Sequence, residues 1–135
     1  MKSIKYKGVF KMNTVSLIGN VASDFYVNEY QDKKGETQYV VNGSIIVNEP
    51  QGANREDVTT RVNITAFRGR ATTLKDLTVK GSQIGITGRL REDSYEKDGK
   101  TVYKTYVLVE DVKLLDTKEQ TEAKRDKLKD NPSNE

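Results

Sequence analysis

The chain has 135 residues, of which 34% are hydrophobic and 32% are charged, and its formal net charge is +3. This length supports one domain with one core, and the mild positive charge permits a polyanionic partner without requiring one. The absence of cysteine and histidine excludes disulfides and thiolate nucleophiles and removes the commonest general base and metal ligand. Because there is no long apolar run and no signal-peptide pattern, we expect a cytoplasmic location and no membrane contact.

Five stretches alternate apolar and polar residues with a period of two, which predicts half-buried strands. They cover residues 13–21, 37–47, 57–67, 82–90 and 101–115. The polar segment 28–36 is expected to be a long hairpin loop between the first two strands. Asp98-Gly99 predicts a tight hairpin turn between the last two strands.

One segment has the spacing of a helix. Between the third and fourth strands, residues 70–81 place Ala71, Leu74 and Leu77 at helical intervals and end at Gly81, a suitable C-cap residue. Five strands with one helix between the third and fourth is the arrangement of the OB-fold, a small all-β barrel that binds oligonucleotides or oligosaccharides. Another small antiparallel sandwich or barrel is the alternative.

The apolar pattern ends at Leu115. Residues 116–135 contain only Ala123 and Leu128 as apolar side chains, which is too little to order the segment by burial. We therefore expect a flexible tail that forms at most a fragile helix.

The outward side of the third and fourth strands carries cations and aromatic rings. If Val62 and Ile64 face the core, their neighbours face outward, and a phenylalanine on that side is unfavourable unless something covers it. Single-stranded nucleic acid needs this mixture, because cations contact phosphates and rings stack on bases for roughly 1–3 kcal/mol each. The candidate binding residues are Arg61, Asn63, Phe67, Arg68, Arg70, Arg89, Arg91 and Tyr95.

Other interpretations of these residues remain open. Phe67 could plug the barrel or contact another subunit, and the arginines and Tyr95 could form an ordinary solvated face. An enzyme is disfavoured, because the acidic residues fall in turns and in the tail and no phosphate-binding loop motif is present. We expect no catalytic residue, no metal site and no cofactor.

The same stretches resemble the bacterial and phage single-stranded DNA-binding proteins over residues 12–115. "MNTVSLIGNVASD" is similar to the opening of that family, and "AFRGRATTLKDLTVKGSQIGITGRLREDSY" with the following hairpin and strand is similar to its second half. The resemblance implies an OB-fold, usually assembled as a homotetramer, with a dimer as the other expectation. It also implies sequence-independent binding and protection of single-stranded DNA during replication, recombination and repair.

The family's stacking rings carry over at two positions. Phe67 falls on the family's phenylalanine at the end of the third strand, and Tyr95 falls where a tryptophan or another aromatic residue stacks. Arg61 stands where relatives often have a tryptophan, and its planar guanidinium can stack or pair with phosphate. Three rings in the first loop are either replacement platforms or oligomer contacts: Phe25, Tyr26 and Tyr30.

The resemblance also implies a division of the chain into a basic extension at 1–11, a binding domain at 12–115 and a tail at 116–135. The tail lacks the acidic run and terminal Pro-Phe through which cellular members recruit partner enzymes. We therefore expect a phage or mobile-element type whose replication or recombination partners dock elsewhere than at the C-terminal tip. The alternatives are an OB-fold interaction module of a replication or primosome assembly and an RNA-binding OB-fold.

Overall fold

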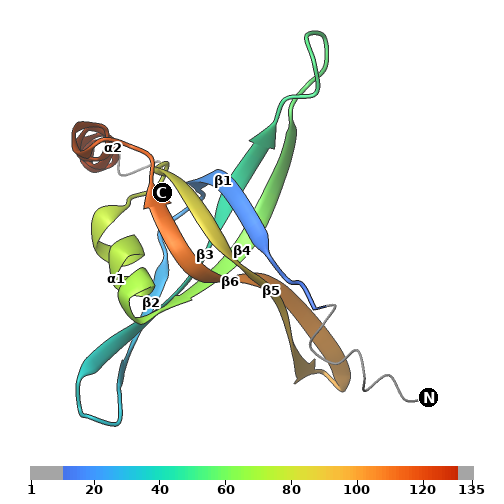
Figure 1. The fold of residues 1–135 in the computed structure, drawn as a ribbon, viewed down its shortest axis with the longest axis vertical. Coiled ribbons are helices and arrows are strands. Elements are labelled where there is room, and N and C mark those ends of the chain that lie inside the picture. The colour runs from blue at the N-terminus through green and yellow to red at the C-terminus, as the bar shows by residue number, and fades with distance from the viewer. Residues whose placement is uncertain (1–10, 131–135) are drawn as a thin grey trace.

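The structure is a computed structural model that describes residues 11–130, so the expected N-terminal extension lies outside it apart from Lys11. Six strands form one sheet in the spatial order β1-β5-β6-β4-β3-β2, and β1 also pairs with β3, which closes the sheet into a barrel (Figure 1). This confirms the expected OB-fold. The elements are β1 (Val15–Val21), β2 (Tyr26–Gln31), β3 (Thr37–Glu49), β4 (Val58–Phe67), α1 (Arg68–Leu77), β5 (Gln83–Lys97), β6 (Lys100–Leu114) and α2 (Lys118–Asp130).

The barrel has one more strand than the sequence pattern predicts. The first four residues of the segment expected to be a loop, 28–31, belong to β2, which pairs antiparallel with β3 from Tyr26 opposite Asn42 to Gln31 opposite Thr37. Most of its side chains are exposed on both sides, because β2 lies at the edge of the sheet beside β3 alone. An edge strand that buries so little shows no alternation of apolar and polar residues, so its sequence looks like a loop.

The core lies inside the barrel and under α1. Its fully buried large side chains are Ile45, Ile64, Leu74, Ile84, Val41 and Val107. Helix α1 begins at Arg68, two residues before the expected start, and packs Ala71 and Leu74 against β3, β4 and β6. Leu77, which shares their helical spacing, is half exposed at the end of the helix.

The predicted inward side of β4 is confirmed only where the barrel is closed. Ile64 and Ala66 are buried and Val62 is partly buried, but Val58 and Thr60 are exposed. The start of β4 belongs to a β3–β4 ribbon that extends beyond the barrel (Figure 1). Leu90 on β5 continues the apolar alternation of buried Ile84 and Ile86, but it is 50% exposed because the β5–β6 ribbon likewise leaves the barrel there.

A β-bulge marks the point near which the β5–β6 ribbon leaves the barrel. Thr87 pairs with Asp111 and the next residue, Gly88, pairs with Val109, so Glu110 on β6 has no partner of its own on β5. A β-carbon at Gly88 would overlap the carbonyl group of Leu108. Only glycine permits this close approach of the two backbones, which bends and coils the strands.

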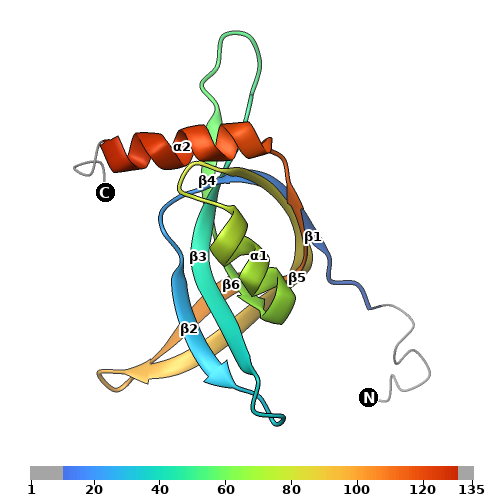
Figure 2. The same ribbon diagram turned by 90° about the vertical axis from the view of Figure 1, so that its left-hand side faces the viewer.

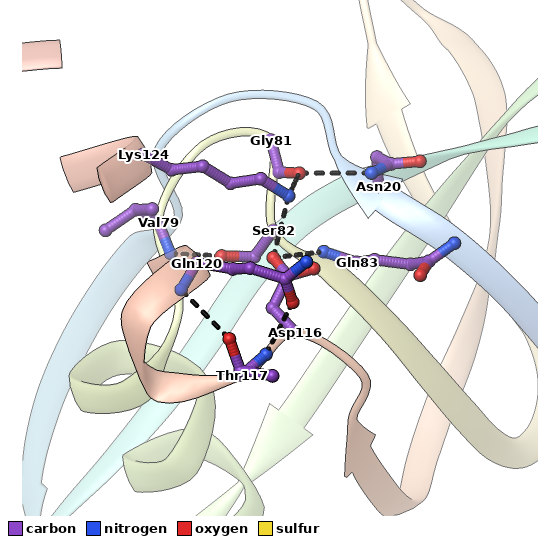
Figure 3. Close-up of polar contacts among 9 residues, drawn as sticks. All are labelled: Asn20, Val79, Gly81, Ser82, Gln83, Asp116, Thr117, Gln120 and Lys124. Carbon is purple, nitrogen blue, oxygen red and sulfur yellow. Dashed lines mark hydrogen bonds and ion pairs between the residues drawn. The ribbon is translucent and has the colours of Figure 1, made fainter. Parts of the chain in front are cut away.

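Part of the segment expected to be a flexible tail forms helix α2, which lies across one end of the barrel (Figure 2). Thr117 and Gln120 form a reciprocal capping box, in which each side chain accepts a hydrogen bond from the other's backbone amide, at 3.1 and 2.7 Å. Lys124 Nζ lies 2.7 Å from the Asp116 carboxylate and donates to the Gly81 carbonyl at 2.9 Å (Figure 3). These contacts are polar, so a search for apolar periodicity could not find them.

Candidate nucleic-acid interface

The outer face of β4 carries the side chains that the sequence pattern places there. Arg61, Asn63 and Phe67 are exposed, and Phe67 keeps 43% of its surface accessible although it is a large apolar residue. Their alternation with buried Ile64 and Ala66 follows from the period of a strand. The predicted orientation of these three residues is confirmed.

Strand pairing brings the β5 arginines onto the same face. Thr65 on β4 pairs with Leu108 on β6, and Leu108 pairs with Arg89 on β5. Directly paired residues point to the same side of a sheet, and so do residues two apart along a strand. Arg89 and Arg91 therefore lie on the outer face two strands away from Phe67, with β6 between them.

Hydrogen bonds hold several polar side chains along this face. Arg61 Nη1 donates to the Ser44 hydroxyl at 3.0 Å, and the Thr65 hydroxyl lies 2.7 Å from Asn42 Oδ1. The amide of Asn63 donates to the Thr105 carbonyl at 3.4 Å. These contacts restrict rotamers before any ligand arrives, which reduces the entropy lost on binding.

The bulge brings two candidate arginines together. Arg70 Nε donates to the backbone carbonyl of Glu110 at 2.7 Å, and Arg89 Nε lies 3.4 Å from the Glu110 carboxylate. Arg70 comes from α1 and Arg89 from β5, so residues 19 positions apart meet at one point of the surface. Both arginines are exposed and can also contact a phosphate.

Arg68 takes a different direction from the other arginines. It begins α1 with a positive φ of 57° and lines a hollow beside the β2–β3 hairpin together with Tyr30, Lys33 and Lys34. The pKa of Asp32 in that hairpin is lowered chiefly by the hydrogen bond from the Glu36 amide, and the charge of Arg68 adds to this effect. The structure thus places Arg68 at the margin of the outer face.

Tyr95 lies on the β5–β6 ribbon, beyond the barrel. It alternates with Arg89, Arg91 and Asp93, pairs with Val102 on β6, and is 51% exposed. Tyr103 pairs with Ser94 and therefore occupies the opposite side of the same ribbon. The structure separates Tyr95 from Phe67 along the face, with the two β5 arginines between them.

Two further tyrosines belong to the outer face. Tyr106 pairs with Arg91, and burial together with a hydrogen bond to the Asp93 carboxylate raises its pKa. Tyr26 on β2 pairs with Asn42, which pairs with Thr65. Neither position followed from the sequence, because Tyr106 depends on the register of a bulged strand and Tyr26 depends on the unexpected strand β2.

The three rings of the first predicted loop separate into two groups. Phe25 packs against the core, and a β-carbon added to Gly43 would overlap its ring. Phe25 is therefore a core residue rather than a platform or a subunit contact. Tyr26 and Tyr30 lie on β2 and alternate with Phe25, so they point to the outer side.

The residues described, 11–130, contain no group of three or more acidic side chains that could hold a metal ion. Within the same range, no helix is both long and apolar enough to cross a bilayer.

Comparison with known proteins identifies the family. The model of the "Single-strand binding protein family" matches residues 12–115. The chain belongs to this family. The matched range covers β1 to β6 and ends before α2. The family is one of binding proteins rather than enzymes, in agreement with the sequence-based expectation.

Individual relatives cover most of the family domain. "Single-stranded DNA-binding protein 2" of Streptococcus agalactiae serotype V is 36% identical over 110 residues, which is 80% of each chain. A "Single-stranded DNA-binding protein" of Staphylococcus epidermidis is 30% identical over 107 residues, or 79% of each chain. A protein of the same name from Bacillus cereus is 29% identical over 130 residues, covering 90% of this chain and 71% of the relative.

Proposed function

We propose that this protein binds single-stranded DNA, without sequence preference, across the outer face of β4, β6 and β5. The observation that carries the proposal is the position of exposed Phe67 and Tyr95 on one face with the β5 arginines between them. The proposal is also supported by membership of the single-strand binding protein family, because the relatives of this chain are named single-stranded DNA-binding proteins. The proposed contact residues are Arg61, Asn63, Phe67, Arg68, Arg70, Arg89, Arg91 and Tyr95.

Each kind of side chain has a separate role in this proposal. Phe67 and Tyr95 stack on bases, which requires no particular base because every base has a π face. Arg89, Arg91 and Arg70 contact phosphates as charged donors. Arg61 presents a guanidinium plane already oriented by Ser44, suited to either role.

The assembly we propose is a homotetramer or a dimer. Exposed Ile18 and half-exposed Leu115 border a hollow of about 450 Å³ over β1, β5 and β6. An exposed apolar patch of this kind suits a subunit contact. Light scattering coupled to size exclusion measures the oligomer, and a monomer at micromolar concentration would contradict this part of the proposal.

The cellular role we propose is protection of single strands in replication, recombination and repair, in a bacterial cell or a phage-infected host. Partner proteins of these processes are expected to dock outside the DNA-contacting face. This role follows from the resemblance to the family and goes beyond the names of its relatives.

Fluorescence anisotropy tests the binding itself. Labelled oligo-dT, oligo-rU and a duplex of equal length are titrated with the protein at several salt concentrations. We expect tight binding to oligo-dT, weak binding to duplex, and a slope of log affinity against log salt near about −3, from roughly four phosphate contacts. Tighter binding to oligo-rU would favour the RNA-binding alternative. Absence of binding to any strand would overturn the proposal and favour a protein-interaction module.

A further inference from the structure

One acidic residue stands among the cations of the proposed binding face. The pairing of β5 with β6 passes over Glu110, which lies between Val109 and Asp111 and has no partner of its own on β5. A bulge bends its strand locally and re-aims the extra residue. The carbonyl group and the side chain of Glu110 therefore contact groups outside the regular pairing of the two strands.

Glu110 offers one acceptor to each of two arginines. Arg70 Nε, from α1, donates to its backbone carbonyl at 2.7 Å. Arg89 Nε, from β5, lies 3.4 Å from its carboxylate. Both contacts use Nε, the guanidinium nitrogen nearest to the side-chain stem, so one residue anchors two arginines of different elements in the same way.

The outer nitrogens of both arginines remain available. A guanidinium has five N–H donors, of which one is on Nε and four are on the two Nη nitrogens. Within residues 11–130, no hydrogen bond or ion pair engages the Nη groups of Arg70 or Arg89. Planar donors of this kind match the oxygens of a phosphate in a bidentate contact.

The contacts of Glu110 affect order more than stability. The side chains of Arg89 and Glu110 are each 48% exposed, and exposed ion pairs contribute little to folding because water screens their charges. Ordering a free, flexible side chain on binding lowers affinity by about 2- to 12-fold. An arginine that is already held before the strand arrives avoids much of this loss.

Asp111 carries the same charge on the same face without this role. It pairs with Thr87, which alternates with Arg89 along β5, so its side chain also points outward. Its ion-pair partner is Lys113, at 3.5 Å. The two neighbouring acids therefore place equal charge near a bound strand, but of the two only Glu110 contacts arginines within the described part of the chain.

We propose that Glu110 is a positioning residue that holds Arg70 and Arg89 as a pair, so that their Nη groups bind one phosphate of the single strand together. The inference rests on the proposed function and deepens it. It gives a role to a carboxylate on a face that binds a polyanion, where a negative charge would otherwise only weaken binding. Two guanidiniums and one carboxylate leave a net charge of +1 for the phosphate.

Anisotropy titrations with labelled oligo-dT test this role by comparing the two acids. If each acid only repels DNA, Glu110→Ala and Asp111→Ala bind more tightly than the wild type to the same extent. We expect Glu110→Ala to bind about 2- to 12-fold more weakly than Asp111→Ala, because the strand itself must then order Arg89. Glu110→Gln keeps an oxygen that accepts a hydrogen bond from Arg89 Nε, so it should bind as tightly as Asp111→Asn.

A second background shows whether Glu110 acts through Arg89. In the Arg89→Ala protein, Glu110→Ala should no longer bind more weakly than Asp111→Ala, because the arginine that it positions is absent. The carbonyl of residue 110 is retained in every variant, so the anchor of Arg70 is unchanged. Urea unfolding of each variant is measured in parallel and should show a retained fold.

The outcomes separate this role from the proposed function. If Glu110→Ala and Asp111→Ala bind equally tightly while Phe67→Ala loses affinity, Glu110 does not position the arginines and the proposed function stands. The positioning role is also overturned if Glu110→Gln binds as weakly as Glu110→Ala, or if the effect of Glu110→Ala persists without Arg89. If the wild type binds no single strand, both fail.

Discussion

Arg61 donates a hydrogen bond of 3.0 Å from its guanidinium to the hydroxyl of Ser44 on the neighbouring strand. Ser44 is buried, whereas Arg61 is exposed, so the guanidinium is held along the surface of the sheet. A guanidinium fixed in this way can present its plane to a base and its edge to a phosphate.

Substitutions of Arg61 should separate these two roles. Arg61→Lys keeps the charge but loses the plane, so we expect weaker binding to oligo-dT with an unchanged salt slope. Arg61→Ala loses both, and the salt slope should flatten by about 0.7 if one phosphate contact is lost. Anisotropy titrations at four salt concentrations measure both quantities. If Arg61→Lys binds oligo-dT like the wild type, the positive charge alone explains the contribution of Arg61 to binding, and its guanidinium plane does not stack on a base.

Phe67→Ala and Tyr95→Ala should each weaken binding to oligo-dT by about 1–3 kcal/mol, the contribution of one stacked base. Because both residues are about half exposed, at 43% and 51%, each change should lower the free energy of unfolding by less than the loss of a buried ring would. Tyr103→Ala is the matched control, since Tyr103 lies on the other side of the ribbon that carries Tyr95. Urea unfolding is measured in parallel. If Phe67→Ala lowers the free energy of unfolding but keeps the affinity for oligo-dT, Phe67 stabilises the fold and does not stack on a base.

Gly88→Ala should destabilise the barrel by about 1–3 kcal/mol or more, because the new methyl group overlaps the backbone of Leu108, which cannot move cheaply. Gly85→Ala on the same strand is the control. A β-carbon there meets side-chain atoms at ordinary distances of 3.7 and 3.8 Å, so its effect should be under about 1 kcal/mol. Urea denaturation of the two variants measures the difference, and equal stabilities would contradict the bulge geometry.

Truncation after Leu115 should lower the free energy of unfolding by about 1–2 kcal/mol and leave DNA affinity unchanged. It removes Asp116 and Lys124, whose charged hydrogen bonds join α2 to Gly81 and Gln83. Lys124→Met should reproduce part of the loss. Thermal melts measure the change as a shift of several degrees. A loss of binding in the truncated protein would assign α2 to the DNA site.

The β2–β3 hairpin should loosen in acid. The folded-state pKa of Asp32 is lowered from 3.8, chiefly by the hydrogen bond from the Glu36 amide, so the charged carboxylate stabilises the turn. This stabilisation is complete above the unfolded-state pKa and is lost as pH falls through the lower folded-state value. NMR titration should show the Lys34 and Glu36 amide shifts following Asp32 below about pH 4. In Asp32→Ala the two amide resonances should not shift together over this pH range. A concerted shift in that variant would show that a group other than Asp32 causes the change.

Much of the site was predictable because it depends on alternation along single strands. The period of two fixed which residues of β4 face the core near Ile64, and it thereby placed Arg61, Asn63 and Phe67 outside. The same local rule placed Arg89, Arg91 and Tyr95 on one side of β5. Burial of one side against a core makes such a pattern visible in the sequence.

Pairing between distant segments decided the rest. Strand β2 depends on β3 for its hydrogen bonds and buries few side chains. The pairing of β2 with β3 and of β3 with β4 therefore decides that Tyr26 and Tyr30 lie on the same side of the sheet as Phe67. Helix α2 depends on Asp116, Lys124 and Gly81 meeting in space. Leu90 and Val58 are exposed because their ribbons extend past the closed barrel, where nothing covers an apolar side. Local sequence specifies which residues alternate, but what lies opposite each residue is set by contacts far apart in the chain.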